Sequence, residues 1–125
     1  NSLDRVALKN FFNSDIFKRI KNSPLVKKEM RFLTEVAATK INPNLDKIYE
    51  NENVIIQGAV DICFVEDDGL VILDFKTDRV DDITDLKDAY SEQLSIYALA
   101  CEKIFEKPVK EKIIYSFKFS DTIKI

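Results

Sequence analysis

The sequence contains no histidine, only two cysteines, and no apolar run long enough to cross a membrane. Histidine is the commonest general base and metal ligand near neutral pH, so any chemistry must use carboxylates, lysine and tyrosine, or groups from another piece of protein. Cys63 and Cys101 are too few for a structural zinc site or an iron–sulfur cluster, and we expect reduced thiols in an apolar core. A membrane span needs roughly 20 apolar residues, so we expect a cytoplasmic protein without a membrane partner.

The composition is typical of a single globular domain. Of 125 residues, 46% are hydrophobic and 33% are charged, which is enough for one sizeable core under a well-solvated surface. The formal net charge is −3. A nucleic-acid-binding domain is usually locally basic, so this charge argues mildly against one. It is still compatible with an acidic catalytic site whose contacts to nucleic acid lie elsewhere on the surface.

Hydrophobic spacing predicts an α/β fold with a mixed central sheet and a long helix packed across it. Ser14 can cap a short helix, and Asp82 or Thr84 can cap the long one, which Pro108 prevents from continuing. The predicted helices cover residues 2–13, 14–22 and 84–106, and the predicted strands cover 25–37, 54–65, 70–76 and 113–119, with a short tail at 122–125 that can pair with the last strand. Residues 41–53 are predicted to be a polar connection. Because the chain starts abruptly on a helix, we expect it to be truncated from a larger protein at its N-terminus.

Two predicted strands joined by the acidic turn 66–69 carry carboxylates inside apolar runs. Asp61 lies in the first strand, and Asp74 lies near the end of the second, two residues before Lys76. An unpaired carboxylate is costly to bury, so these acids need a partner. A cross-strand salt bridge near a sheet edge and a metal site both satisfy that need, and the spacing alone leaves both open.

The metal interpretation gives each residue of the pattern a chemical role. Asp74 and Lys76 point to the same face of a strand, roughly 6–7 Å apart along the backbone, and an antiparallel neighbour brings Asp61 within reach. Mg²⁺ prefers oxygen ligands, commonly one or two carboxylates, and the carbonyl of Phe75 is a natural further ligand. A bound metal polarises a phosphoryl oxygen and lowers the pKa of a water, while the lysine stabilises charge or helps to orient and deprotonate the nucleophile.

Two glycines and a pair of helical residues flank these strands. Gly58 allows a bulge or a close backbone approach, and Gly69 is expected to supply a positive φ in the turn. Gln93 and Tyr97 are four apart on the long predicted helix and therefore share a face. They can brace Lys76 and contact a DNA backbone, or they can simply be a half-buried tyrosine beside a surface glutamine.

Taken together, these motifs resemble the RecB-family nuclease domain of the PD-(D/E)xK superfamily, in particular the C-terminal nuclease domains of AddA-type helicase–nucleases. The resemblance covers nearly the whole chain. It rests on three motifs in this order and spacing: Gln57-Gly58-Ala59-Val60-Asp61, Asp74-Phe75-Lys76-Thr77-Asp78, and Gln93-Leu94-Ser95-Ile96-Tyr97. It implies a restriction-endonuclease-like α/β fold with a mixed central sheet, in which residues 1–125 form a single nuclease domain.

The resemblance also implies a role for each motif residue. Asp61 and Asp74 would be metal ligands with the backbone carbonyl of Phe75, and Lys76 would be the catalytic lysine. Glu29 would be the acid of the upstream strand, and the remaining residues would support the site or contact DNA: Gln93, Tyr97 and Arg79. The implied cofactor is Mg²⁺, with Mn²⁺ as a substitute.

The implied function is Mg²⁺-dependent hydrolysis of DNA, as an exonuclease, in double-strand-break repair and recombination. The implied partners are DNA and an AddB-like protein, in the bacterial cytoplasm at the nucleoid. ATP would serve only a helicase part that this chain lacks.

The chain departs from the family pattern in one respect. The family site includes a histidine on an upstream helix, and this sequence has no histidine. We expect truncation before the start of the chain to account for the difference, in which case the isolated piece lacks one metal ligand and need not be active.

Two other functions fit parts of the pattern. One is a non-catalytic DNA-binding or docking module with a nuclease-like fold, which the intact Asp61, Asp74 and Lys76 disfavour. The other is a stand-alone RecB-like exonuclease, which the abrupt start and the lack of iron–sulfur cysteines disfavour. Basic residues that could contact phosphates without reading sequence fall in two groups: Lys18, Arg19 and Lys21, and Lys27, Lys28 and Arg31.

Overall fold

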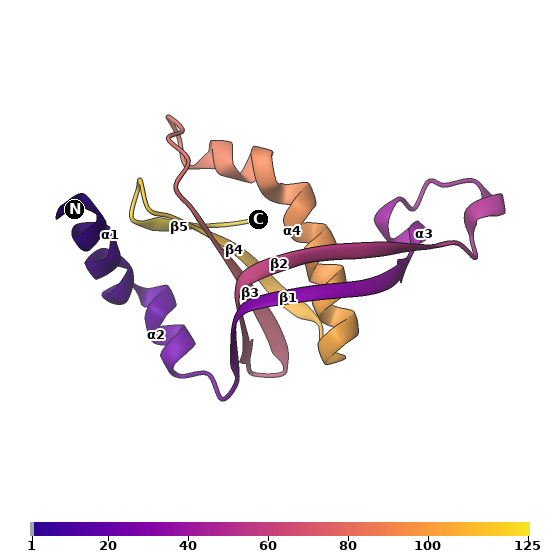
Figure 1. Cartoon of the computed structure of the whole chain (residues 1–125), viewed down its shortest axis with the longest axis horizontal. Coiled ribbons are helices and arrows are strands. Elements are labelled where there is room, and N and C mark those ends of the chain that lie inside the picture. The colour runs from indigo at the N-terminus through magenta and orange to yellow at the C-terminus, as the bar shows by residue number, and fades with distance from the viewer. Residues whose placement is uncertain (1) are drawn as a thin grey trace.

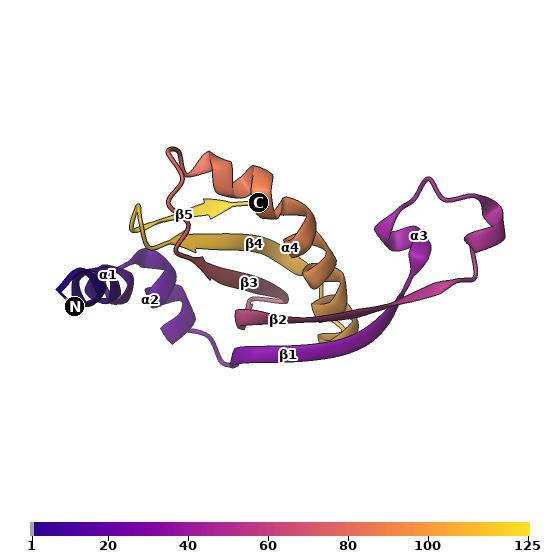
Figure 2. The same cartoon turned by 45° about the horizontal axis from the view of Figure 1, so that its top comes forward.

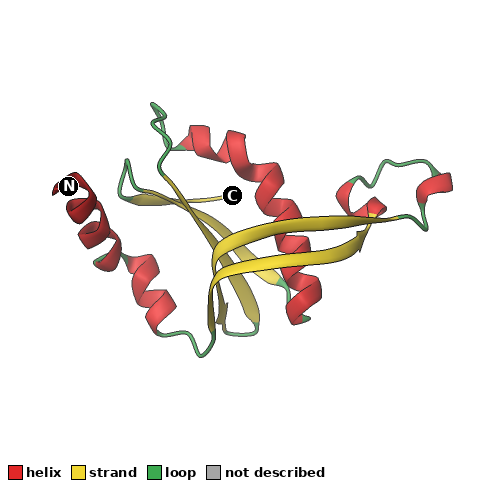
Figure 3. Ribbon diagram, viewed as in Figure 1, coloured by secondary structure: helices red, strands yellow, loops and turns green. Residues whose placement is uncertain are grey.

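A computed structural model describes residues 2–125 and confirms the predicted α/β fold (Figures 1 and 3). Five strands form one mixed sheet in the order β1-β2-β3-β4-β5. The elements are α1 (Ser2–Phe12), α2 (Asp15–Lys21), β1 (Val26–Ala37), α3 (Ala38–Ile41), η1 (Lys47–Tyr49), β2 (Asn53–Glu66), β3 (Gly69–Lys76), α4 (Thr84–Phe105), β4 (Val109–Ser116) and β5 (Asp121–Lys124). Within these residues, no helix combines the length and apolar character needed to span a membrane.

The connection between β3 and β4 determines the architecture. These two strands are parallel, whereas every other neighbouring pair in the sheet is antiparallel. A parallel pair needs a long crossover, which α4 provides by packing across the sheet (Figures 1 and 2). The helix covers Thr84–Phe105, close to the predicted 84–106. Its first turn is held by Asp82, whose Oδ1 accepts hydrogen bonds from the N–H and the hydroxyl of Thr84, both at 2.9 Å.

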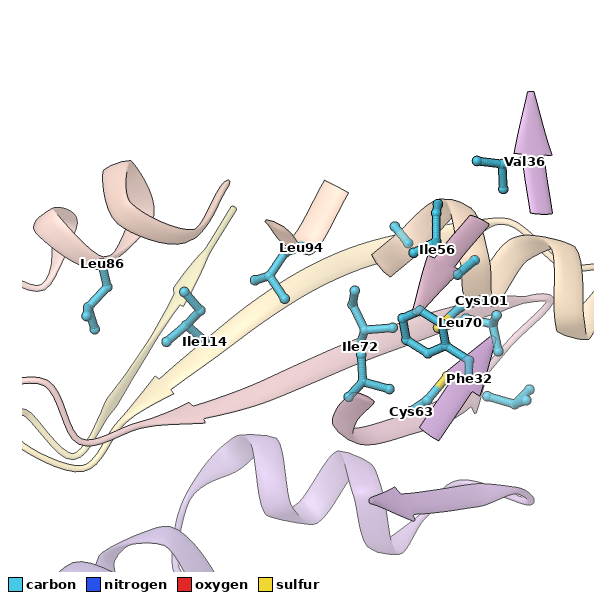
Figure 4. Packing of buried hydrophobic residues seen from close by; sticks show 14 residues of the cluster. Phe32, Val36, Ile56, Cys63, Leu70, Ile72, Leu86, Leu94, Cys101 and Ile114 are labelled. Carbon is cyan, nitrogen blue, oxygen red and sulfur yellow. The ribbon is translucent and has the colours of Figure 1, made fainter. Parts of the chain in front are cut away.

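Both faces of the sheet are covered, as the apolar β3 strand predicts. Ile72 points to the α4 side, and its neighbours Val71 and Leu73 point to the side of α1 and α2. Figure 4 shows the α4 side, where Leu86, Leu94 and Cys101 of the helix meet sheet residues that include Cys63.

Both cysteines are buried and free, which confirms the expected reduced core thiols. The hydroxyl of Ser14 caps α2 as predicted, accepting the N–H of Phe17 at 3.3 Å.

Strand β2 extends well beyond its pairing with β3. Its pairing with β3 covers only Ile62–Glu66, whereas its pairing with β1 continues to Asn53. Residues 53–61 and the second half of β1 therefore form a two-stranded arm that extends past the sheet, with α3 and η1 at its end (Figures 1 and 2). Residues 41–53, predicted to be a polar connection, form most of the tip of this arm.

Two local predictions are corrected by the structure. The positive φ in the 66–69 turn belongs to Asp67 (φ 56°) and not to Gly69, because aspartate tolerates the left-handed region. Gly69 is needed for space, since a Cβ there would lie 3.2 Å from the carbonyl oxygen of Pro108. Strand β4 covers Val109–Ser116 and not 113–119, because parallel pairing already begins at Leu70↔Val109 and a turn follows Ser116. The tail pairs with β4 as predicted.

One ion-pair network fastens α2 to the end of the sheet near the 66–69 turn. Arg19 donates from Nε and Nη2 to the two carboxylate oxygens of Glu66 at 2.8 and 2.7 Å, and it also reaches Glu111 at 3.2 Å. Lys110 adds a contact to Glu66 at 2.9 Å. The hydrogen bonds from Arg19 lower the pKa of Glu66 from 4.5 to about 2. Four of the five N–H donors of Arg19 are thus engaged within the protein, which leaves one for a DNA phosphate.

This network predicts a specific loss of stability in acid. The pKa of Glu66 is lower in the folded than in the unfolded chain, so its contribution is full above pH 4.5 and disappears as the pH falls to about 2. Because the pair is about a quarter to a third exposed, we expect a contribution of about 1 kcal/mol to the free energy of unfolding. Urea titrations between pH 2 and 7 should show Glu66→Gln less stable than wild type at pH 7 and equal to it at pH 2. The exposed Glu50→Gln is the matched control, and identical pH profiles for wild type and Glu66→Gln would contradict the prediction.

Candidate active site

The candidate site lies at the fork where β2 leaves β3. Backbone pairing between the two strands ends at Ile62↔Leu73, and the next facing positions are Asp61 and Asp74. Here the side chains take over from the backbone carbonyls. The N–H of Asp61 donates to Oδ1 of Asp74 at 3.2 Å, and the N–H of Phe75 donates to Oδ2 of Asp61 at 2.8 Å. Each carboxylate is therefore fixed by the opposite strand, and the structure brings the two predicted acids together.

The electrostatic environment of this pair is unfavourable without a cation. Asp74 is only 5% exposed, and burial raises the pKa of its carboxyl, with a further increase from the charge of Asp61. The N–H of Asp61 and the ammonium of Lys76 oppose that increase only in part. In the part of the chain whose side chains are described, Oδ1 of Asp61 and Oδ2 of Asp74 accept no hydrogen bond. Two fixed carboxylates with one free oxygen each form a donor set suited to a hard divalent cation.

Lys76 is held between a carboxylate and an aromatic ring. Its side chain is 19% exposed, and Nζ lies 3.8 Å from Oδ2 of Asp74. On another side, Nζ lies 4.0 Å from the ring centroid of Tyr90, a residue of α4. The hydroxyl of Tyr90 donates to Oδ2 of Asp78 at 2.7 Å. The roles of Tyr90 and Asp78 were not predicted from the sequence, because the helical spacing places Tyr90 on the apolar face and marks it only as core.

Tyr97 packs against the arm. Its ring lies edge-on to Phe32 of β1, with centroids 5.1 Å apart. A Cβ on Gly58 of β2 would lie 2.7 Å from two ring carbons of Tyr97, so the glycine provides the close approach that the sequence predicts. Gln93 is exposed on α4. Among the described contacts, Lys76 meets the ring of Tyr90, whereas Tyr97 contacts Phe32 and Gly58 on the two strands of the arm; the bracing role expected of Gln93 and Tyr97 stays a prediction.

Glu29 lies opposite Asp61 in the β1–β2 register but does not form a metal-binding group with Asp61 and Asp74. It faces Asp61 across the β1–β2 pair, between the partners Lys28↔Ile62 and Met30↔Val60. Its φ is 48°, in the left-handed region that non-glycine residues rarely adopt, and it is exposed. Among the described residues, no three His, Cys, Asp or Glu side chains form a metal-binding group. The site therefore presents two carboxylates and a lysine, with a strained third acid beside them.

The basic residues predicted to contact phosphates differ in availability. Lys27, Lys28 and Arg31 are exposed on β1, on either side of Glu29. Arg79 is exposed in the loop that follows β3. The three β1 cations pair in register with β2 residues on either side of Asp61, whereas Arg19 is ion-paired at the end of the sheet near the 66–69 turn.

The contact between Gly58 and Tyr97 predicts the outcome of adding one methyl group. Gly58 does not have a positive φ, so Gly58→Ala causes no backbone strain and acts only through the ring of Tyr97. We expect an overpacking loss of about 1–3 kcal/mol in the free energy of unfolding, measured by urea titration. The same substitution in a Tyr97→Ala background should cost much less, because the clash is gone. An equal cost in both backgrounds would show that the ring is not responsible.

Sequence comparison relates the chain to known proteins. A family model described as the PD-(D/E)XK nuclease superfamily matches residues 5–122. An ATP-dependent helicase/nuclease subunit of Clostridium botulinum strain Okra is 47% identical over 116 residues, which is 92% of this chain and 9% of that protein. The corresponding protein of Clostridium kluyveri, which has the same name, is 42% identical over 108 residues, covering 86% of this chain and 9% of that protein. The chain thus spans about a tenth of the length of these curated relatives, and because the family model covers nearly all of it, the chain belongs to the PD-(D/E)XK nuclease superfamily.

Proposed function

We propose that this chain is a nuclease domain that hydrolyses DNA phosphodiester bonds with Mg²⁺. The observation that carries the proposal is the carboxylate pair at the fork, Asp61 and Asp74, with Lys76 held beside it. A salt bridge alone accounts poorly for this arrangement. The buried Asp74 and the half-buried Asp61 lie beside one lysine, whose Nζ is 3.8 Å from Oδ2 of Asp74, and one ammonium does not compensate two carboxylates.

The residues that would hold the metal are Asp61 through Oδ1, Asp74 through Oδ2, and Phe75 through its backbone carbonyl. When bound, Mg²⁺ or its substitute Mn²⁺ supplies Lewis-acid stabilisation of phosphoryl charge and lowers the pKa of a coordinated water. The protein's own contribution is orientation. The hydrogen bonds that join Asp61, Asp74 and Phe75 fix both carboxylates before any ligand arrives, so little reorganisation accompanies binding.

Lys76 would act as the catalytic lysine. Its ammonium lies close to the carboxylate pair and can donate to a phosphate oxygen or to the attacking water, stabilising negative charge as it develops. Arg79 and Gln93 are exposed near the site and would contact the DNA backbone, and the cations of β1 would extend that contact along the arm. Tyr97 would support the site by positioning β2.

The function of the larger assembly follows only from the relatives. Their name couples a helicase with a nuclease, and this chain matches about a tenth of their length. We infer that the domain works as an exonuclease beside an ATP-driven helicase in the bacterial cytoplasm, with DNA and an AddB-like protein as partners in recombinational repair. ATP would be bound by the helicase part and not by these residues.

Substitution of the site residues tests the proposed chemistry. Asp74→Ala and Lys76→Ala should each reduce Mg²⁺-dependent cleavage of linear DNA by about 100-fold or more, because each removes charge stabilisation from the transition state. The matched controls are Asp68→Ala in the exposed turn and Lys47→Ala at the arm tip, which should cleave normally. Isothermal titration with Mn²⁺ should detect binding to wild type and to Lys76→Ala, and a loss of binding in Asp61→Asn and Asp74→Asn. DNA binding without any metal-dependent cleavage in wild type would favour the non-catalytic module instead.

The strained Glu29 gives a second test, because strain and charge can be separated. Glu29→Gly removes both the carboxylate and the left-handed strain, so we expect a gain of about 1 kcal/mol in the free energy of unfolding together with weaker cleavage. Glu29→Gln keeps the strain and should lose only activity. Glu106→Gly, at a left-handed residue (φ 54°) that ends α4 away from the fork, should gain stability without losing activity. Normal cleavage by Glu29→Gly would exclude a role for this acid.

A further inference from the structure

We propose that Tyr90, locked in place by Asp78, is a positioning residue for the ammonium of Lys76. The proposal rests on the proposed function, in which Lys76 is the catalytic lysine, and it adds two residues to the site. Neither belongs to the carboxylate pair, and Tyr90 comes from α4, 14 positions after Lys76 in the chain. Its ring makes the contact to the lysine that the sequence pattern assigned to Gln93 and Tyr97.

The ring of Tyr90 provides attraction without neutralising the lysine. With Nζ 4.0 Å from the ring centroid, the ammonium lies well within the range of a cation–π interaction. A lysine side chain has four rotatable bonds and loses much rotamer freedom when it is fixed. A carboxylate partner would fix it too, but it would occupy the ammonium donors. An aromatic face holds the group without a competing acceptor oxygen and leaves the N–H donors that do not face the ring free for a substrate phosphate.

The ring also balances the pull of Asp74. Lys76 Nζ lies 3.8 Å from Oδ2 of Asp74, which is beyond hydrogen-bond distance. Without a competing contact, nothing prevents the flexible stem from closing that gap and forming a tight ion pair. Such a pair would occupy the same Asp74 oxygen that is free to bind a metal. We infer that Tyr90 keeps the two charges apart, so that each is available for its own ligand.

Asp78 fixes the ring itself. The hydroxyl of Tyr90 donates to Oδ2 of Asp78 at 2.7 Å, a short hydrogen bond to a charged acceptor. The loop that carries Asp78 is anchored further along, where Lys118 donates to the carbonyl of Val80 and Asp82 caps α4. The chain runs from Lys76 on β3 through the loop with Asp78 to Tyr90 on α4, and the ring of Tyr90 contacts both Lys76 and, through its hydroxyl, Asp78. A displacement of α4 would move the ring and, with it, the ammonium.

Nuclear magnetic resonance can test the contact without relying on activity. Protons above an aromatic face are shifted upfield, so the ε-methylene protons of Lys76 should be upfield of those of the other lysines in the 125-residue chain. The shift should persist in Tyr90→Phe and disappear in Tyr90→Leu, while Tyr49→Leu at the exposed arm tip should leave it unchanged. A Lys76 signal that is the same in wild type and in Tyr90→Leu would overturn the proposal.

Kinetics and metal affinity test the consequence. Tyr90→Leu should lower kcat about 10- to 100-fold with little change in KM for DNA, because the lysine is misplaced and not lost. Its affinity for Mn²⁺ should also weaken, since Lys76 can now pair with Asp74. Removing only the lock, with Tyr90→Phe or Asp78→Ala, should give smaller losses, and the double variant should lose no more than either alone. Additive losses, or a kcat for Tyr90→Leu within about threefold of wild type, would contradict the proposal.

These measurements separate this proposal from the proposed function. If wild type cleaves no DNA, the proposed function fails, while the Lys76 shift and the Mn²⁺ affinities still decide whether Tyr90 positions the lysine. If Tyr90→Leu does not fold, Tyr90→Phe and Asp78→Ala decide through their non-additive loss. Normal cleavage by both of these variants would then show that the lock has no role.

Discussion

The burial of Asp74 beside Asp61 decides what the surrounding strands and α4 must supply. A fully apolar strand leads to Asp74, and the sheet is covered on both faces there, so this carboxylate has little contact with water. Its neighbour is a second carboxylate, whose charge makes ionisation still harder. The fold compensates with backbone N–H groups from the opposite strand and with one lysine. These groups hold the two carboxylates in place but do not neutralise all of their negative charge. A bound divalent cation would neutralise the remainder.

The departure of β2 from β3 makes room for this site. Backbone pairing must stop for the carboxylates to replace it, and β2 then continues as one strand of the arm. Tyr97 holds that arm against α4 by packing into the space over Gly58, while Tyr90, two turns earlier on the same helix, reaches Lys76. One helix therefore sets the positions of two parts of the site: the strand that carries Asp61 and the ammonium of Lys76.

Much of this fold could be predicted from sequence, because its main elements are long and regularly patterned. Asp82 before α4 and Pro108 after it predict the bounds of that helix. The hydrophobic spacing predicts the β2–β3 hairpin and the pairing of the tail. The facing of Asp61 and Asp74 could be predicted as well, since a short turn fixes the register. Features that depend on tertiary packing were missed or wrong. The left-handed residue of the turn is Asp67, β4 begins earlier because it pairs with Leu70, and Tyr90 serves the site although its spacing marks it only as core.

We propose that Asp61 and Asp74 together bind a divalent cation. A crystal structure of the chain soaked in Mn²⁺, with anomalous data, tests this most directly because it locates the metal without requiring catalysis. We expect a single strong peak at the fork, bonded to Oδ1 of Asp61 and Oδ2 of Asp74, with Lys76 Nζ still over the ring of Tyr90. An empty fork at saturating Mn²⁺, with Lys76 closed onto Asp74 as a simple ion pair, would contradict the claim.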